Sequence, residues 1–248
     1  MSKPALKVAV LVSGGGTNLQ AIIDAIFNGK IANTHISLVV STNPKAYALE
    51  RAKNFRIESL VLKKADFASN AAREDALHEE LSKRDIDLVV FSGCLMILSA
   101  DFIERWGKPI INVHPSLLPA YGGHGFHGIA VHEAVLAAGE TQTGATVHYI
   151  DGGIDTGDII LQKAVAVHPN DTPQTLQQRV MEEAEWIILP QAISIFAQKK
   201  AKETSNCHPE PHGCHPELDS GSTCDTKALC PHCNIEKSNS GSCRHCGL

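Results

Sequence analysis

The sequence predicts an α/β protein: a doubly wound, mostly parallel sheet with helices on both faces, followed by a small Cys-rich tail. Short apolar runs alternate with segments of helical period through residues 1–200. Glycines or polar turn residues directly follow several of these runs. The cysteines are unevenly placed, since Cys94 is alone in the first 206 residues and seven crowd the last 42.

The first half of the chain repeats a strand, a turn and a helix. LKVAVLVS is an apolar run of strand length, GGG follows as a turn, and TNLQAIIDAIF places apolar residues at helical spacing. HISLVVS then precedes AYALERAKN, and ESLVLK precedes NAAREDALHEELSKR. DLVVFSG leads through a helical stretch around SADFIERW to PIINVH. This alternation is typical of parallel strands joined by right-handed crossovers.

The sequence of the second half of the globular region predicts two strands and one helix. GATVHYI and DIILQKAVAV read as strands, and RVMEEAEWIILP reads as a helix. We expect AYGGHGFHGIAVHEAV to be a lid or substrate loop, and assign no role to its His124, His127 and His132. Composition divides the chain into a globular domain at residues 1–202, a low-complexity linker at 203–229 and a tail at 230–248.

Charge and hydropathy narrow the function. A formal net charge of -5 and a pI near 6.2 give no general electrostatic reason to bind nucleic acid or an anionic membrane. The sequence shows no apolar run of membrane-spanning length and no signal-peptide pattern at the start. We therefore expect a cytoplasmic protein that acts on small molecules, as a monomer or homodimer.

The glycine-rich stretch Ser13–Asn18, SGGGTN, opens the first predicted helix. Glycines let the backbone approach an anion, and the free N–H groups of a helix start attract phosphate. The stretch is neither a P-loop nor a dinucleotide fingerprint. A phosphate site is one interpretation, and a tight turn with Thr17 or Asn18 as an ordinary cap is the other.

Asn112 and His114 lie two residues apart where the strand PIINVH ends. Residues i and i+2 of a strand face the same side, so these side chains converge at the sheet edge, and Pro115 ends the pairing. An amide donor and an imidazole together suit stabilisation of an oxyanion, as acyl transfer requires. A structural histidine at a strand end is the alternative.

The loop between the last two predicted strands carries Asp151, Asp155 and Asp158. A carboxylate brought beside His114 is expected to orient the imidazole and raise its pKa. Two of the three aspartates are expected only to shape turns.

With these motifs in view, the chain resembles phosphoribosylglycinamide formyltransferase, a folate-dependent family of purine biosynthesis. The resemblance covers about residues 6–200 and rests on SGGGTN, NVHPSLLP, GATVHY with DTGDIILQ, and RVMEEAEWIILP. It implies Asn112, His114 and Asp155 as catalytic residues, 10-formyltetrahydrofolate as cosubstrate, glycinamide ribonucleotide as acceptor, and no catalytic metal.

The resemblance also implies two sets of binding residues. The glycinamide ribonucleotide set is Gly15, Gly16, Thr17, Asn18, Gly93, Val113 and Glu185. The folate set is Leu95, Met96, Ile97, Leu98, Asn112 and Arg73, where Met96 replaces an Arg of many family members. The implied mechanism is direct attack of the amine on the formyl carbon, with Asn112 and protonated His114 stabilising the oxyanion. Cys94 is expected to be a buried small residue and not a nucleophile.

Three other functions stay open. Methionyl-tRNA formyltransferase shares the Asn-x-His-Pro-Ser core, but usually has a further RNA-binding domain. Formyltetrahydrofolate hydrolase passes the formyl group to water and has an extra N-terminal regulatory domain. A non-catalytic nucleotide-binding module with a metal-binding tail is the third.

The tail predicts a small zinc ribbon. Cys230 and Cys233 form one Cys-x-x-Cys pair, and Cys243 and Cys246 form another after nine residues. A disulfide pair is the alternative, which a reducing cytoplasm disfavours. We expect the tail to hold structural zinc and to bind an unidentified partner.

Overall fold

The computed structural model describes residues 5–206. The strands are β1 (Leu6–Val12), β2 (Thr34–Ser41), β3 (Ser59–Val61), β4 (Leu88–Phe91), β5 (Ile110–His114), β6 (Gln142–Tyr149) and β7 (Ile159–Ala166). The helices are α1 (Thr17–Phe27), α2 (Tyr47–Asn54), η1 (Lys64–Asp66), α3 (Asn70–Lys83), α4 (Ala100–Trp106), α5 (Ile129–Ala137), α6 (Pro173–Val180), η2 (Met181–Glu185) and α7 (Trp186–Asn206).

The strands form one seven-stranded sheet in the order β3-β2-β1-β4-β5-β6-β7. The pairs from β3 to β5 are parallel, whereas β5–β6 and β6–β7 are antiparallel. The chain moves outward from β1 to β3 and then crosses to β4 on the other side of β1. The predicted doubly wound, mostly parallel sheet is therefore confirmed, and its topological switch point lies between β1 and β4.

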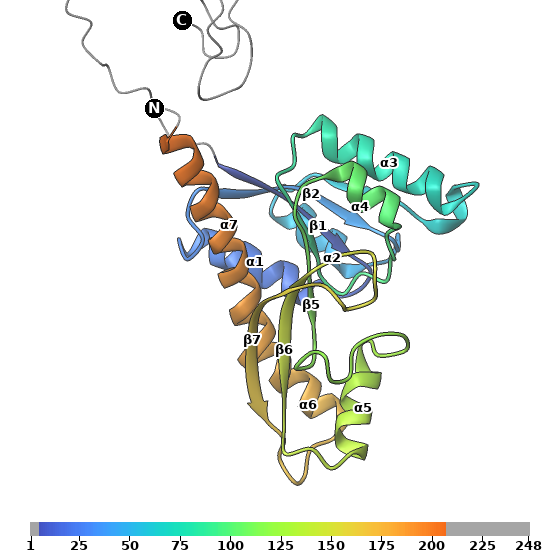
Figure 1. The fold of residues 1–248 in the computed structure, drawn as a ribbon, viewed down its shortest axis with the longest axis vertical. Helices are drawn as coiled ribbons and strands as arrows, with labels where there is room; N and C mark the ends of the chain where they lie inside the picture. The colour runs from blue at the N-terminus through green and yellow to red at the C-terminus, as the bar shows by residue number, and fades with distance from the viewer. Residues whose placement is uncertain (1–4, 207–248) are drawn as a thin grey trace, which may run out of the picture. The chain divides into compact units, whose positions relative to one another are not determined.

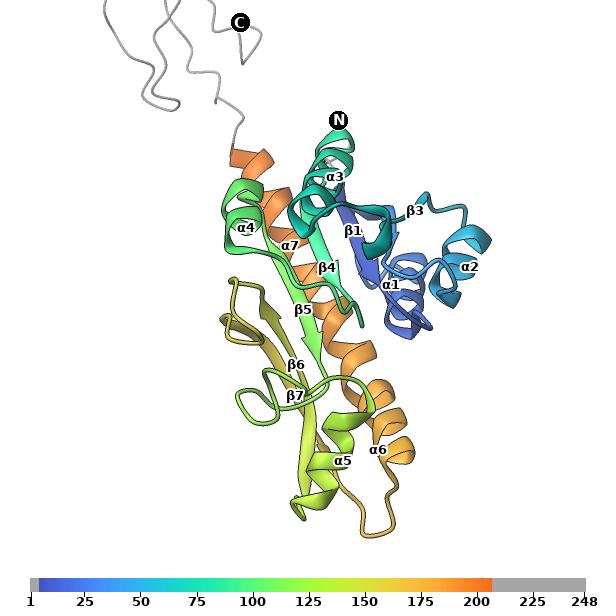
Figure 2. The same cartoon turned by 90° about the vertical axis from the view of Figure 1, so that its right-hand side faces the viewer.

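Helices cover both faces of this sheet. In Figure 1, α1 and α7 lie on one side of the central strands, and α3 and α4 lie on the other. Two apolar clusters correspond to these layers, one with Leu19 of α1 and Ile193 of α7, the other with Leu77 of α3 and Phe102 of α4. β1 contributes alternate residues to both clusters, which explains its continuous apolar sequence. Figure 2 shows α5 and α6 beside each other at the far end of β6 and β7.

Local sequence signals begin and end several helices. The hydroxyl of Ser69 accepts from the Ala72 N–H at the start of α3, and Ser99 accepts from Phe102 at the start of α4. Gly107 ends α4 in the left-handed conformation that glycine adopts most easily. No helix within residues 5–206 has the length and apolarity to cross a membrane.

The structure departs from the sequence reading in three places. Residues 129–137 of the expected loop form α5, because Val131 and Val135 bury one side of this segment. The π-turn η2 divides the single helix expected at residues 179–190. Within α7, Pro190 has no N–H to donate to the carbonyl of Trp186, so one helical hydrogen bond is missing there. α7 continues to Asn206, so it includes residues 203–206 of the expected linker. The remainder of the linker and the predicted zinc ribbon lie outside the described residues.

Candidate active site

The carboxyl ends of β1 and β4 carry two loops that meet at the switch point. Ser13 Oγ, after β1, accepts from the N–H of Leu95, after β4, at 3.1 Å. The same hydroxyl lies 2.7 Å from Thr42 Oγ1, after β2. Three strand ends are thereby tied together where open α/β sheets bind ligands.

The glycine loop has the features of an anion site. Gly16 has φ 70° and precedes α1, whose first turn is not capped by a side chain. A Cβ at Gly16 would lie 2.6 Å from Ala48 Cβ, so only glycine fits this approach to α2. Arg51 Nε donates to the carbonyl of Gly15 at 2.9 Å and holds the loop from the α2 side. The N–H groups of the helix start are therefore available to a phosphate.

Asn18 and Glu185 connect this loop to η2. Asn18 Nδ2 donates to Glu185 Oε2 at 2.5 Å, although 167 residues separate them. Glu185 is buried, and this burial raises the pKa of its carboxyl, against the lowering effect of the Asn18 hydrogen bond. Asn18 Oδ1 is buried without a hydrogen-bond partner. Thr17 Oγ1 contacts Met181 Sδ at 3.7 Å, which joins the loop to η2 a second time.

The stretch after β4 alternates between exposed and buried side chains. Gly93 turns the chain with φ 63°. Leu95 and Ile97 are 67% and 64% exposed, whereas Met96 and Leu98 pack into the core beside Phe102. Of the apolar side chains in the predicted folate set, therefore, those of Leu95 and Ile97 face solvent in this structure.

Two further residues of the predicted set lie in the interior. Arg73 is buried, donates from Nε to the carbonyl of Leu62 at 2.9 Å, and lies near the thiol of Cys94. Burial raises the pKa of the Cys94 thiol, which agrees with an unreactive small residue. Val113 turns its side chain into the core, so a ligand contact there is limited to its backbone.

Asn112 and His114 occupy the end of β5 and face the same side, as predicted. Their neighbours Ile111 and Val113 point into the opposite core cluster. In the antiparallel pairing with β6, Asn112 lies opposite His148 and His114 lies opposite Thr146. His114 is 4% exposed, while Asn112 is partly exposed.

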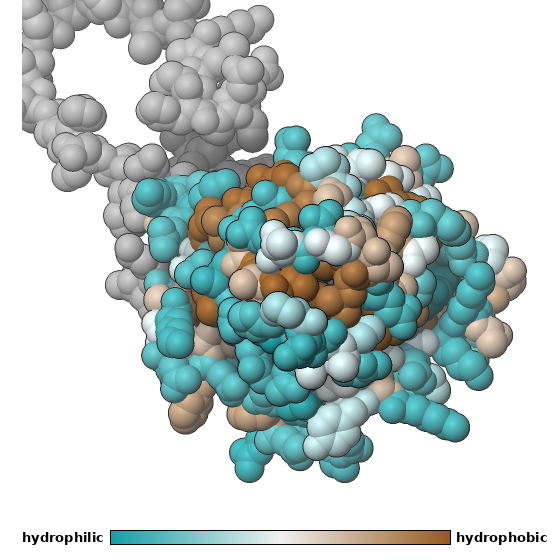
Figure 3. Space-filling model, turned by 90° about the horizontal axis from the view of Figure 1, so that it is seen from below, coloured by the Kyte–Doolittle hydropathy of each residue, from teal (hydrophilic) through white to brown (hydrophobic). Residues whose placement is uncertain are grey.

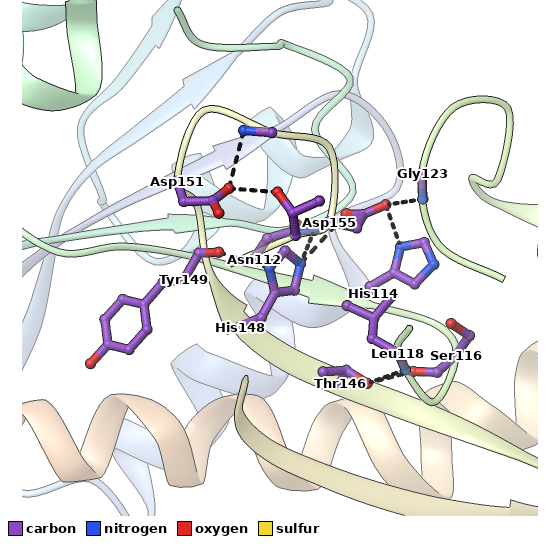
Figure 4. Close-up of polar contacts among 12 residues, drawn as sticks. Asn112, His114, Ser116, Leu118, Gly123, Thr146, His148, Tyr149, Asp151 and Asp155 are labelled. Atoms are coloured by element: carbon purple, nitrogen blue, oxygen red, sulfur yellow. Dashed lines mark hydrogen bonds and ion pairs between the residues drawn. The ribbon is translucent and has the colours of Figure 1, made fainter. Parts of the chain in front are cut away.

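The third predicted residue, Asp155, lies beside His114 (Figure 4). His114 Nδ1 is 3.5 Å from Asp155 Oδ2, and the Gly123 N–H donates to the same oxygen at 3.1 Å. His114 Nε2 lies 2.8 Å from the carbonyl oxygen of Tyr121, so this nitrogen carries the proton of the neutral ring. Tyr121 and Asp155 have φ of 54° and 57°, a left-handed conformation that costs energy outside glycine.

The electrostatics of His114 differ from the sequence expectation. Burial lowers the pKa of His114, and it outweighs the raising effects of Asp155 and of the Tyr121 carbonyl. Asp155 thus acts in the expected direction, but the net shift of the His114 pKa is downward because burial dominates and His148 adds to the lowering. Burial raises the pKa of Asp155, but its neighbours His148 and His114 and the Gly123 N–H together lower it more.

Sequence reasoning missed three groups at this site. His148 Nε2 lies 3.2 Å from Asn112 Nδ2 and 3.5 Å from Asp155 Oδ1. The Tyr121 carbonyl and the Gly123 N–H hold His114 and Asp155 from the loop after β5. His148 lies in the predicted strand GATVHYI, but its position opposite Asn112 depends on the pairing of β5 with β6, which the sequence does not show. Backbone groups leave no trace in residue type.

The other candidate residues have structural, exposed or buried positions outside the reacting group. Asp151 accepts from the Gly153 N–H and the Thr156 hydroxyl, so it shapes the loop as expected. His124 and His127 are exposed, whereas His132 of α5 is fully buried next to His114. Burial lowers the pKa of His132 to about 4. Within residues 5–206 no three His, Cys, Asp or Glu side chains are grouped to hold a metal.

The surface of the described residues has a hollow and an apolar area. A hollow of about 600 Å³ lies between α1 and α7, lined by residues that include Thr17, Arg51 and Trp186, and it does not contain Asn112 or His114. The face seen from below in Figure 3 has apolar surface near its middle, surrounded largely by hydrophilic side chains. The reacting site is assigned from its convergent polar groups and not from the size of a hollow.

Comparison with known proteins defines the class. Residues 6–193 match the family described as Formyl transferase. The chain belongs to this family, and the resemblance seen in its motifs is confirmed.

The relatives specify the branch. Phosphoribosylglycinamide formyltransferase of Haemophilus influenzae is 36% identical over 81% of this chain and 91% of its own length. Glycinamide ribonucleotide transformylase 1 of Symbiobacterium toebii has a crystal structure with TM-score 0.73 and 37% identity, covering 79% of this chain and 89% of that one. The trifunctional purine biosynthetic protein adenosine-3 of Drosophila pseudoobscura pseudoobscura is 39% identical over 85% of this chain, which spans 15% of that longer protein.

Proposed function

We propose that this enzyme transfers the formyl group of 10-formyltetrahydrofolate to the amine of glycinamide ribonucleotide, a step of purine biosynthesis. The observation that carries the proposal is the convergence of Asn112, His114 and Asp155 at the carboxyl edge of the parallel strands, which also carries a glycine loop suited to phosphate. The names of the relatives support the same reaction.

The glycine loop accounts for the acceptor. The N–H groups of Gly16, Thr17 and Asn18 are proposed to bind its phosphate, and Glu185 its polar groups, in line with the junction between Asn18 and Glu185. The exposed side chains of Leu95 and Ile97 are proposed to contact the flat face of the pterin ring, which suits apolar side chains better than a charged group does.

The reaction follows from the geometry of His114. The uncharged amine attacks the formyl carbon, and the C=O electron pair moves to oxygen, where an N–H of Asn112 stabilises the oxyanion. Because Nε2 of His114 donates its hydrogen to the Tyr121 carbonyl, Nδ1 is the nitrogen that accepts the proton lost by the attacking amine, directly or through water. Asp155, 3.5 Å away, stabilises the resulting imidazolium. The proton then passes to the folate nitrogen as its bond to the formyl carbon breaks.

A competition assay tests this proposal. The protein is supplied with 10-formyltetrahydrofolate and with glycinamide ribonucleotide, charged initiator tRNA or water as acceptor. Formylation of glycinamide ribonucleotide supports the proposal, provided that His114→Ala abolishes it. Preference for tRNA or water, or near-normal turnover in His114→Ala, contradicts it.

The rest of the chain is proposed to play no part in the chemistry. Four cysteines, Cys230, Cys233, Cys243 and Cys246, have the spacing of a structural zinc ribbon, and the tail is proposed to bind a partner. A cytoplasmic monomer or homodimer agrees with the negative net charge and with small-molecule substrates.

A further inference from the structure

His148 has a defined hydrogen-bonding state in this site. It is 2% exposed, and its Nδ1 lies 2.8 Å from the carbonyl oxygen of Tyr149. A carbonyl only accepts, so Nδ1 carries the hydrogen, and in the neutral ring Nε2 is an acceptor. The group nearest to Nε2 is the amide nitrogen Nδ2 of Asn112, at 3.2 Å, which donates to it.

The backbone around His148 is shaped to aim this ring. His148 lies directly opposite Asn112 across the β5–β6 pair, where side chains on one face meet. The β6–β7 register shifts between Val147 and His148, and bulges of this kind redirect side chains next to active sites. Gly157 passes so close to the Tyr149 carbonyl that a Cβ there would overlap it. This close passage closes the loop that carries Asp155.

We propose that His148 is a positioning residue for formyl transfer: its Nε2 holds one N–H of the Asn112 amide and so directs the other N–H to the oxyanion. The inference rests on the proposed function, since it assigns a task to Asn112 in that reaction. Without an acceptor at this position, the amide of Asn112 rotates freely, and its oxygen competes with its nitrogen for the place facing the formyl oxygen.

Asp155 Oδ1 lies 3.5 Å from the same Nε2 of His148. The titratable groups that face His148 are therefore His114 on β5 and Asp155 on the β6–β7 loop. Because Nδ1 carries the hydrogen, Nε2 accepts from Asn112 and does not donate to Asp155.

The test compares His148→Leu, which removes the acceptor but fills the space, with His148→Gln, which restores an amide oxygen as acceptor. His35→Leu, at an exposed position of β2, is the control for loss of an imidazole. We expect His148→Leu to lower kcat about tenfold with an unchanged KM for glycinamide ribonucleotide, in keeping with one lost hydrogen bond. His148→Gln should recover most of kcat.

A double-mutant cycle with Asn112→Ala separates this inference from the proposed function. If His148 acts through Asn112, His148→Leu costs little more once Asn112 is absent. Additive effects of the two substitutions on kcat, or wild-type turnover in His148→Leu, overturn the inference. If Asn112→Ala alone is slow, the proposed function still stands. Normal turnover in Asn112→Ala overturns both. A kcat loss in His148→Leu that His148→Gln does not relieve also overturns the inference.

Discussion

Asp155→Asn isolates the charge that faces His114. The substitution keeps the size of the side chain and an oxygen for the Gly123 N–H, but removes the negative charge 3.5 Å from His114 Nδ1. For unit charges at this distance, an effective dielectric constant near 20 gives an attraction of about 5 kcal/mol. Desolvation and the remaining hydrogen bonds offset part of it. We expect turnover to fall about a hundredfold, which corresponds to about 2.7 kcal/mol of transition-state stabilisation.

The pH profile supplies a second measurement. Burial lowers the pKa of His114 and Asp155 raises it, so removal of the carboxylate lowers the pKa further. Because the neutral imidazole is the proposed base, activity is lost as pH falls through this pKa. The acid limb of kcat should therefore move to lower pH in Asp155→Asn.

The assay is steady-state formyl transfer with both substrates, measured across pH for wild type and variant. Asp151→Asn is the matched control, because Asp151 lies in the same loop but accepts only from Gly153 and Thr156. A turnover within threefold of wild type, or an acid limb that does not move, would refute the role given to Asp155.

Three further predictions follow from other parts of the molecule. Gly16→Val should raise the KM for glycinamide ribonucleotide and change the KM for the folate little, because a Cβ at this position meets Ala48. Glu185→Ala should have the same effect on the two KM values. An effect on the KM for the folate alone contradicts the proposed division of the site. Burial lowers the pKa of His132 from 6.5 to about 4, so between these values the unfolded chain binds more protons than the folded one. The free energy of unfolding therefore decreases as the pH is lowered from 6.5 to about 4, by on the order of 3 kcal/mol. Urea unfolding should show a flatter acid dependence in His132→Leu, and an unchanged slope argues against this origin. Truncation after Asn206, the end of α7, should reduce bound zinc from about one per chain to none while formyl transfer persists. Zinc retained by the truncated protein, or loss of activity, contradicts the prediction that the tail is a zinc ribbon without a catalytic role.

Much of the fold and part of the site were predictable from local patterns. The apolar run of β1 and the helical spacing of α1 depend on neighbouring residues, so their bounds follow closely from sequence. Asn112 and His114 face one side because a strand has a period of two, and this also needed no tertiary information. The helix at residues 129–137 was missed, since its apolar residues lie on more than one side and its stretch begins among glycines.

Sequence alone therefore determined the class of fold, the strand ends that carry polar residues, and the family. Only the tertiary structure placed His148 opposite Asn112, because the register of β5 with β6 joins residues 36 positions apart. It also reversed the expected pKa shift of His114. A neighbouring carboxylate can be inferred from sequence, but the loss of water around the ring depends on everything packed against it, and here that loss outweighs the charge of Asp155.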